Sequence, residues 1–289
     1  MKESNGEKIF HFVNDFIMIL TALICLLPVV HIFARAFSGA SAIGTGKVIF
    51  WPVQFHVKGI TYILEYTGFL RSLLNSVIIT IIGTVFALLC TILTAFALAH
   101  EKLKGRNVII YIYVFSMIFN AGIVPHYFLI KNLHLLNTLW CLILPSVVSP
   151  YYTFVLKRGF ESVPSALEEA AMIDGASWFT ILRLVVLPVT KAQVATIVVF
   201  YSVHYWNKYF DAMVYITDNN LKPITMFLYD MVKHTNIIDF SGAYGSMTNL
   251  SQDVFNAATV FLTVIPILAV YPFMQKYFIK GAVAGAVKG

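Results

Sequence analysis

The segment SLLNSVIITIIGTVFALLCTILTAFALA, residues 72–99, contains no Asp, Glu, Lys or Arg. As a helix it is long enough to cross a hydrocarbon core of about 30 Å. Further apolar blocks of roughly 20 residues lie near 16–34, 108–130, 138–156, 185–206 and 257–275. Because the apolar residues form long blocks rather than stripes with a helix or strand period, the sequence predicts an all-α integral membrane protein with six transmembrane helices.

The composition supports the same class. The 289 residues are 59% hydrophobic and 12% charged, with a mean hydropathy of +0.79, whereas soluble proteins have about 25% charged residues. A net charge of +6 would suit a nucleic-acid partner, but the basic residues lie at the edges of the apolar blocks and are better explained as flanking charges of membrane helices. Cys25, Cys90 and Cys141 lie inside apolar blocks without a C-x-x-C motif, so we expect them to be small packing residues.

Two of the blocks are less regular than the others. Pro188 and Lys191 interrupt the fifth block, whose uninterrupted apolar run begins only at Ala192.

The first block could be a cleavable signal peptide, since Ala40-Ser41-Ala42 resembles a cleavage site. Its apolar core exceeds the usual length of about 7–15 residues for a signal, so we expect a retained helix.

The distribution of Lys and Arg between short loops predicts the orientation of the helices. Placing the N-terminus inside the cell gives the cytoplasmic loops most of the basic residues, and the bias is sharpest in the turn at 101–106. Both termini are then cytoplasmic. We therefore expect a single transmembrane domain over 1–289, with a cytoplasmic loop at 157–191 and extracytoplasmic segments at 36–70 and 207–256.

Several function classes are disfavoured. The span interiors hold essentially no Asp, Glu, Lys or Arg, which argues against a proton- or sodium-coupled carrier and requires that any active transport draw energy from another polypeptide. The segment at 44–48 only superficially resembles a phosphate-binding loop, because Ser41 stands where the first Gly belongs and Val48 replaces the Ser or Thr. No catalytic residue, metal site or cofactor site is predicted, so we expect a protein that is not an enzyme; a channel or a membrane enzyme remains the alternative.

The most informative stretch is SVPSALEEAAMIDGAS, residues 162–177, between the fourth and fifth blocks. It predicts a short cytoplasmic helix that begins with a capping box of Ser165 and Glu168 and stops at a left-handed Gly175. Small, apolar and charged side chains follow one another on this helix: Leu167, Glu169, Ala170, Ala171 and Met172. The helix could dock another protein, or simply link two spans.

This stretch resembles a known signature. Glu169-Ala170-Ala171, then Gly175, then Val185 and Leu187-Pro188 resemble the E-A-A-x-x-x-G signature of binding-protein-dependent ABC importer permeases. Asp174-Gly175-Ala176 is similar to the carbohydrate branch. The signature usually has Ile at the position of Val185 and often Pro at that of Ala192. Other segments are similar to the maltose-type second permease, closest to its oligosaccharide-importing subgroup: 120–125, 135–138, 206–207 and 281–289.

The resemblance implies the six-helix ABC type I importer permease fold in the bacterial plasma membrane. It implies a heterodimer with a second permease, two cytoplasmic ATPase subunits that hold ATP and magnesium, and an extracytoplasmic sugar-binding protein, for which 207–256 is a candidate surface. The helix around Glu169 would be the coupling helix, and the tail at 280–289 would reach toward the ATPases. The residues expected to contact an ATPase are Leu167, Glu169, Ala170, Ala171, Met172, Asp174 and Gly175. Asp174 could instead be a local turn residue.

Sugars bind through aromatic faces and a few hydrogen-bonding groups. Residues of these types in or near the outer ends of the spans are candidates for the substrate pathway: Asn120, Tyr151, Tyr152, Tyr205, Trp206 and Asn207. Tyr205 and Trp206 could instead be interfacial anchors, and Asn120 could serve helix packing. In the maltose-type family the partner permease can hold most sugar contacts, and a non-sugar solute is the alternative substrate.

Overall fold

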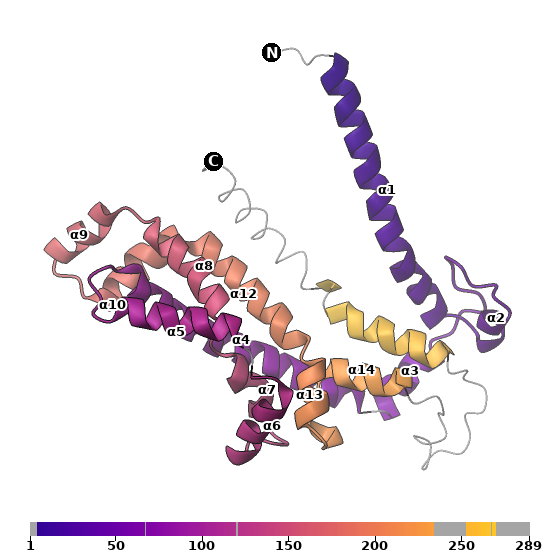
Figure 1. The fold of residues 1–289 in the computed structure, drawn as a ribbon. Helices are drawn as coiled ribbons and strands as arrows, with labels where there is room; N and C mark the ends of the chain where they lie inside the picture. Colours follow the sequence, from indigo (N-terminus) through magenta and orange to yellow (C-terminus); the bar gives the residue numbers. More distant parts are fainter. Residues whose placement is uncertain (1–4, 67, 120, 234–252, 267, 270–289) are drawn as a thin grey trace. The chain divides into compact units, whose positions relative to one another are not determined.

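The computed structural model (Figure 1) describes residues 5–66, 68–119, 121–233, 253–266 and 268–269. The predicted all-α class is confirmed, because the described residues form helices and connecting turns without a β-strand. The chain divides into two compact units: unit 1 comprises 1–69 with 228–266, and unit 2 comprises 70–227 with 267–289.

Unit 1 is built on one long apolar helix. Its helices are α1 (Asn5–Ala36), α2 (Ala40–Gly44), α3 (Lys58–Tyr66) and a helix at Asp253–Pro266. The predicted 16–34 block lies within α1, and its large apolar side chains are mostly exposed, as expected of a surface that lipid or another chain covers. At the end of α1, Ala34 belongs to a buried cluster with Ile43 and Val254. Arg35 forms an ion pair with Asp253 at 3.3 Å.

Unit 2 holds most of the remaining helices. They are α4 (Phe69–Ala99), α5 (Arg106–Ile118), α6 (Ile123–Asn132), α7 (Trp140–Ile143), η1 (Leu144–Ser146), α8 (Pro150–Glu161), α9 (Ser165–Ile173), α10 (Trp178–Ile181), η2 (Leu182–Val186), α11 (Leu187–Val189), α12 (Lys191–Trp206), α13 (Tyr209–Tyr215), η3 (Asn219–Leu221) and the start of α14 (Ile224–Lys233).

Only some of the predicted spans are single straight helices. Among the described residues, α1 and α4 are long and apolar enough to cross a membrane, and the count rises to 4 if the bent pairs α5 with α6 and 178–189 with 191–206 are each one span. The last block is described only as far as the helix at Asp253–Pro266 and residues 268–269. Membrane character is therefore present, whereas six spans and cytoplasmic termini stay predictions.

The fourth and fifth blocks differ from the single helices that their hydropathy suggests. The 138–156 block contains α7, the 3₁₀ turn η1 with Pro145, and the start of α8. Pro150 cannot donate a backbone hydrogen bond, so it opens α8 rather than continuing an earlier helix, and Ser149 caps α8 by accepting from the Tyr152 N–H at 3.4 Å. In the fifth block the axis turns by 87° at Thr190, between α11 and α12.

α12 packs closely against α4. A Cβ atom on Gly83 of α4 would lie only 2.7 Å from the Tyr205 ring of α12, so the two helices meet where α4 has no side chain. Tyr201 and Thr91 share a buried hydroxyl contact of 2.6 Å between the same helices. The Tyr205 hydroxyl donates to the carbonyl of Ile143 at 3.1 Å, which joins α7 to this pair.

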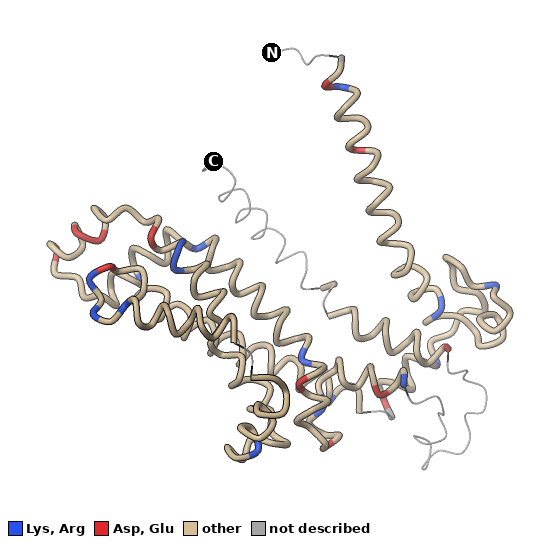
Figure 2. The backbone as a smooth tube through the Cα atoms, in the orientation of Figure 1, with Lys and Arg blue, Asp and Glu red and all other residues tan. Residues whose placement is uncertain are grey.

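The long helices of unit 2 carry their charges near their ends (Figure 2). The only charged residue of α4 is Arg71 and the only one of α12 is Lys191, each in the first turn. In Figure 2 the central parts of these helices and of α5 are uncharged. This pattern is typical of helices whose middle sections lie in hydrocarbon.

Much of the predicted 207–256 segment is helical, since α13, η3 and α14 occupy its first half; residues 234–252 lie outside the described part of the chain. Asn137, at φ 56°, fastens this segment to the turn after α6. Its Oδ1 accepts from the Thr217 N–H at 2.7 Å and the Asp218 N–H at 3.2 Å, and its own N–H donates to the carbonyl of Tyr215 at 3.1 Å.

Candidate functional site

α9 is a separate short helix that begins differently from the prediction. The capping box is wrong: the helix starts at Ser165, Pro164 occupies the capping position, and no side chain caps the N-terminus. The Glu168 carboxylate, which the capping box would direct back to the helix start, turns instead toward His100. A tertiary hydrogen bond thus takes the place of the local cap.

The end of α9 follows the prediction. Gly175 has φ +81°, its N–H donates to the carbonyl of Met172 at 3.0 Å, and the Ala176 N–H donates to the carbonyl of Ala171 at 2.9 Å. These are the two bonds of a Schellman motif, which requires a left-handed residue after the helix. Ala171 and Ala176 both pack on the hydrophobic cluster below α9, so the stop signal also sets which face of α9 points inward.

His100, the residue after α4, holds α9 to the body of unit 2. Its Nε2 lies 3.0 Å from Oε2 of Glu168, and its Nδ1 lies 2.8 Å from the carbonyl oxygen of Phe96 in α4. The imidazole also makes an edge contact with Trp178 of α10, with ring centroids 4.8 Å apart. The His100 and Glu168 side chains are only 24% and 17% exposed, so water screens the pair weakly.

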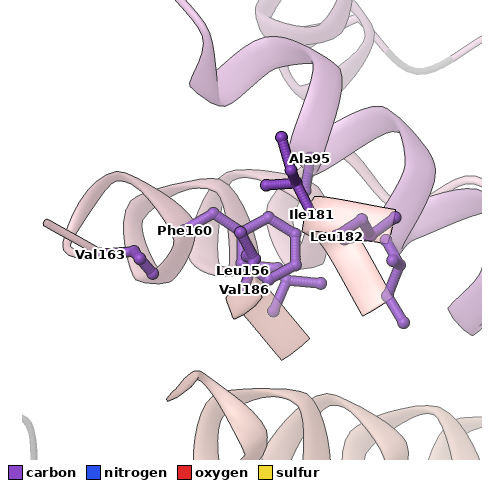
Figure 3. Close-up of a cluster of buried hydrophobic side chains, with 8 residues drawn as sticks. Ala95, Leu156, Phe160, Val163, Ile181, Leu182 and Val186 are labelled. Carbon is purple, nitrogen blue, oxygen red and sulfur yellow. The ribbon is translucent and has the colours of Figure 1, made fainter. Parts of the chain in front are cut away.

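A hydrophobic cluster lies beneath α9 (Figure 3). We call it the basal cluster; it consists of Ile92, Ala95, Leu156, Phe160, Val163, Ile181, Leu182 and Val186. Its members come from α4, from α8 and the turn after it, and from the α10–η2 segment. Val185 and Leu187 of the signature pack against it. The cluster joins both chain segments that flank α9 to the long helix α4.

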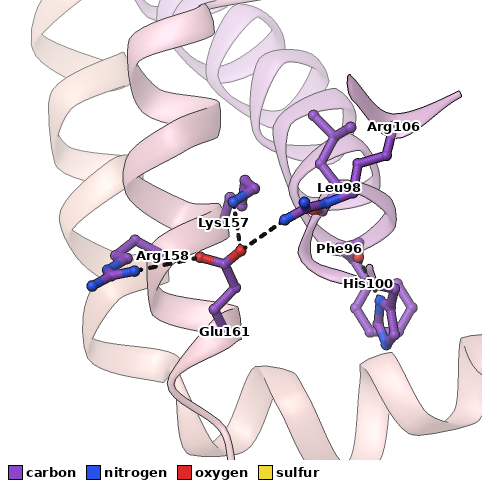
Figure 4. A network of polar contacts seen from close by, with 7 residues as sticks. All are labelled: Phe96, Leu98, His100, Arg106, Lys157, Arg158 and Glu161. Carbon is purple, nitrogen blue, oxygen red and sulfur yellow. Dashed lines mark hydrogen bonds and ion pairs between the residues drawn. The ribbon is translucent and has the colours of Figure 1, made fainter. Parts of the chain in front are cut away.

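An ion-pair network lies beside this cluster (Figure 4). Glu161, at the end of α8, accepts from Lys157 at 2.5 Å and from Arg106 of α5 at 3.1 Å, and Arg158 lies 3.9 Å away. The Nε of Arg106 donates to the carbonyl of Leu98 in α4 at 2.8 Å. The network therefore ties the ends of α4, α5 and α8 together, and its cations account for part of the basic bias of the predicted cytoplasmic loops.

The outer face of α9 carries most of the residues expected to contact an ATPase. Glu169, Ala170, Asp174 and Gly175 are exposed, and Leu167 and Met172 are 46% and 41% exposed. Within the described residues, Glu169 has no hydrogen bond or ion pair. Ala171 differs from the rest, because it is half-buried and packs inward.

Ile173, which is not among the predicted ATPase contacts, has a side chain that is 87% exposed. It stands next to Met172 at the end of α9 and enlarges the apolar part of the outer face. A large apolar residue directly before the Asp-Gly pair that ends the helix was the signal that could have identified Ile173. The last turn of a short surface helix is exposed to solvent on most sides, so an apolar side chain there suggests a contact surface. His100 had no such local signal.

The residues proposed for the substrate pathway have different surroundings. Tyr205 is 1% exposed and is a packing residue between α4, α7 and α12. The Trp206 indole Nε1 is buried without a hydrogen-bond partner in the described chain, and Tyr151 is 57% exposed. Tyr152 and Asn207 line one cavity of about 560 Å³. Asn120 lies outside the described residues.

Comparisons with known proteins identify the class. No family model matches the chain. It is 35% identical to the polygalacturonan/rhamnogalacturonan transport system permease protein YtcP of Bacillus subtilis (strain 168), over 98% of this chain and 99% of that protein. It is 26% identical to the arabinooligosaccharides transport system permease protein AraQ of Halalkalibacterium halodurans, over 93% of each.

A solved structure gives the same result. The crystal structure of a bacterial ABC transporter involved in the import of the acidic polysaccharide alginate contains a chain that matches this one with a TM-score of 0.88 and 31% identity, over 96% of this chain and 99% of that chain. The predicted resemblance is therefore confirmed along nearly the whole sequence. This chain belongs to the family of permease subunits of carbohydrate ABC importers, which are membrane proteins and not enzymes themselves.

Proposed function

We propose that the chain forms half of a translocation pathway, together with a second permease, and that α9 is the helix through which cytoplasmic ATPase subunits move it. In this arrangement both termini and α9 lie in the cytoplasm of a bacterial cell, and the chain crosses the plasma membrane six times. Two ATPase subunits hold ATP and magnesium. An extracytoplasmic binding protein delivers the sugar to the opposite side, near residues 207–256.

One observation carries this proposal: in the part of the chain that the structure describes, α9 is held on its inner face, and the side chains of its outer face have no hydrogen bond or ion pair. The Schellman stop, the His100–Glu168 pair and the basal cluster fix the helix to unit 2. Glu169, Met172 and Ile173 face outward. A displacement imposed on the outer face is therefore passed to α4, α8 and the α10–η2 segment without being absorbed within α9.

The residues of the outer face suit a groove on another protein. Ala170 permits close approach of a second backbone, Met172 and Ile173 supply adaptable apolar contacts, and Glu169 can pair with a basic residue. A ligand shifts a conformational equilibrium only if it binds the two states with different affinities. The ATPase must therefore stay bound to α9 while its own groove changes position. Asp174 and Gly175 would lie at the edge of that contact.

The proposed substrate is an oligosaccharide. Relatives named for polygalacturonan/rhamnogalacturonan, for arabinooligosaccharides and for alginate support a fragment of a polysaccharide over a monosaccharide. No observation favours a non-sugar solute or a channel.

The test is reconstitution of the permease in proteoliposomes with the second permease, the ATPase and the binding protein encoded beside it. We expect ATP-dependent uptake of a polysaccharide fragment that contains neutral sugar rings, such as an arabinooligosaccharide, and this uptake should require the binding protein. In a variant without Cys25, Cys90 and Cys141, single cysteines at Glu169→Cys and Ile173→Cys should react with an impermeant maleimide in inside-out vesicles stripped of the ATPase, and not in right-side-out vesicles. Labelling from the outside, or uptake that persists without the ATPase, would refute the proposal.

A further inference from the structure

The cavity of about 560 Å³ in unit 2 has a composition that the coupling role does not explain. It lies between α8, α12 and the start of α13, and its size falls within the range of about 300–1,000 Å³ typical of small-molecule sites. Its aromatic lining residues are Tyr152, Phe200 and Phe210, and its polar ones include His204, Asn207 and Asp211. We propose that this cavity binds one ring of the transported sugar and recognises the hydroxyl groups of that ring. This inference rests on the proposed importer function.

The aromatic side of the cavity offers flat apolar surface. The rings of Tyr152 and Phe200 are stacked, with centroids 5.7 Å apart and planes inclined by 20°. Phe210 is 53% exposed, so its ring is not needed to fill the interior. The C–H face of a sugar ring is apolar and can pack on such rings, while its hydroxyl groups project sideways toward polar side chains.

The polar side of the cavity is organised by Lys208. Its Nζ donates to Oδ2 of Asp211 and to Oγ of Ser146, each at 2.6 Å. The side chain of Lys208 is 5% exposed, whereas that of Asp211 is 34% exposed. The buried cation is thus neutralised by the carboxylate that faces the cavity, and two of the three ammonium protons are already used.

Two oxygen atoms at the cavity are open acceptors. The Nδ2 of Asn207 donates to the carbonyl of Val203 at 2.9 Å, and its Oδ1 makes no hydrogen bond within the described chain. Oδ1 of Asp211 likewise has none there. Sugar hydroxyls can donate to both oxygens. A carboxylate of an acidic sugar would instead meet the negative charge of Asp211, with the charge of Lys208 already balanced, so the site selects hydroxyl groups rather than acid groups.

The test is direct binding to the assembled transporter in nanodiscs, without the binding protein. Saturation-transfer difference NMR can detect weak binding of two probes that share the ring and differ in charge, methyl β-galactoside and galacturonate. We expect signals from the ring protons of methyl β-galactoside. Phe210→Ala and Asn207→Ala should each reduce them about tenfold, the effect of one lost contact of ordinary strength. Phe128→Ala, which removes a similarly exposed aromatic ring from α6, should leave them unchanged.

The outcomes separate the cavity from the importer function. The cavity assignment would be overturned if the signals survive in both cavity variants, or if galacturonate binds and methyl β-galactoside does not. It would also be overturned if neither probe binds to an assembly that imports oligosaccharide in proteoliposomes. In that last case the proposed importer function stands. If the wild-type assembly fails to import any sugar while the probe still binds in a Phe210- and Asn207-dependent way, the importer proposal falls, and the cavity is then a sugar-binding site without a role in import.

Discussion

Nε2 of His100 lies 3.0 Å from Oε2 of Glu168, and this contact joins the end of α4 to the middle of α9. The other ring nitrogen of His100 is held by the carbonyl oxygen of Phe96, so the imidazole has little freedom to follow α9 independently. Glu168 is the direct neighbour of the exposed Glu169. In the proposed mechanism, movement of the outer face of α9 would therefore reach α4 through space as well as along the chain.

The first prediction concerns this contact. Glu168→Ala should weaken the attachment of α9 by about 1–3 kcal/mol, the cost of leaving a partly buried group unpaired, and should raise the number of ATP molecules hydrolysed per sugar imported. Glu168→Gln keeps an oxygen that can face His100 and should retain most of the coupling. An unchanged ratio in Glu168→Ala, measured in proteoliposomes, would mean that the contact plays no part in transmission.

A second prediction addresses the network at Glu161. Glu161→Ala leaves the cations of Arg106 and Lys157 without their shared carboxylate and should lower the free energy of unfolding by about 1–3 kcal/mol. Arg158, whose side chain is 88% exposed, should contribute little. The thermal midpoint of the detergent-solubilised permease reports the effect. Glu101→Ala, an exposed control, should melt like the wild type; equal midpoints in the two variants would contradict the role of the network.

The third prediction tests the contact between α4 and α12. In Gly83→Ala the new methyl group would lie 2.7 Å from a carbon of the Tyr205 ring, so the two helices must separate, at a cost of about 1–3 kcal/mol. Gly44→Ala is the matched control, because no atom lies within 4 Å of its added carbon. We expect a lower thermal midpoint for Gly83→Ala only. A wild-type midpoint would show that the helices are not in such close contact.

A fourth prediction concerns Asn137, whose φ of 56° is uncommon outside Gly, Asn and Asp. Asn137→Ala should increase hydrogen exchange at the amides of Thr217 and Asp218, because their acceptor is removed. Asn137→Gly keeps the backbone conformation but not the acceptor. It should show the same faster exchange with a smaller loss of stability, and protection equal to the wild type in both variants would argue against this link.

The sequence predicted those features that depend on neighbouring residues. The uncharged run at 72–99 became α4, since a long apolar segment has few alternatives to a membrane helix. Gly175 ends α9 as expected, because only a left-handed residue completes the Schellman bonds there. The bend at Thr190 lies within the interruption at Pro188 and Lys191 that the sequence indicated. The break at Pro150 was not predicted, because hydropathy averages over a block and is insensitive to where a helix can continue.

The position of α9 was predictable from the sequence, but the contact that holds α9 to the rest of unit 2 was not. The signature around Glu169 located α9 and most of its exposed face. Glu168 was assigned to a local cap, whereas its partner His100 is 68 residues away; no local pattern encodes such a pair. Tyr205 and Tyr152 looked alike in sequence, and only packing distinguishes the buried Tyr205 from Tyr152 at the cavity.

The ratio of ATP hydrolysed to sugar imported by a Glu169→Lys variant tests most directly whether the outer face of α9 transmits the work of an ATPase. Charge reversal at this exposed position should leave folding and membrane insertion intact, because Glu169 has no partner within the described residues. We expect sugar import to fall by about tenfold or more, as loss of one charge-assisted contact implies, while the ATPase continues to hydrolyse ATP. Import at the wild-type rate with an unchanged ratio would contradict the account.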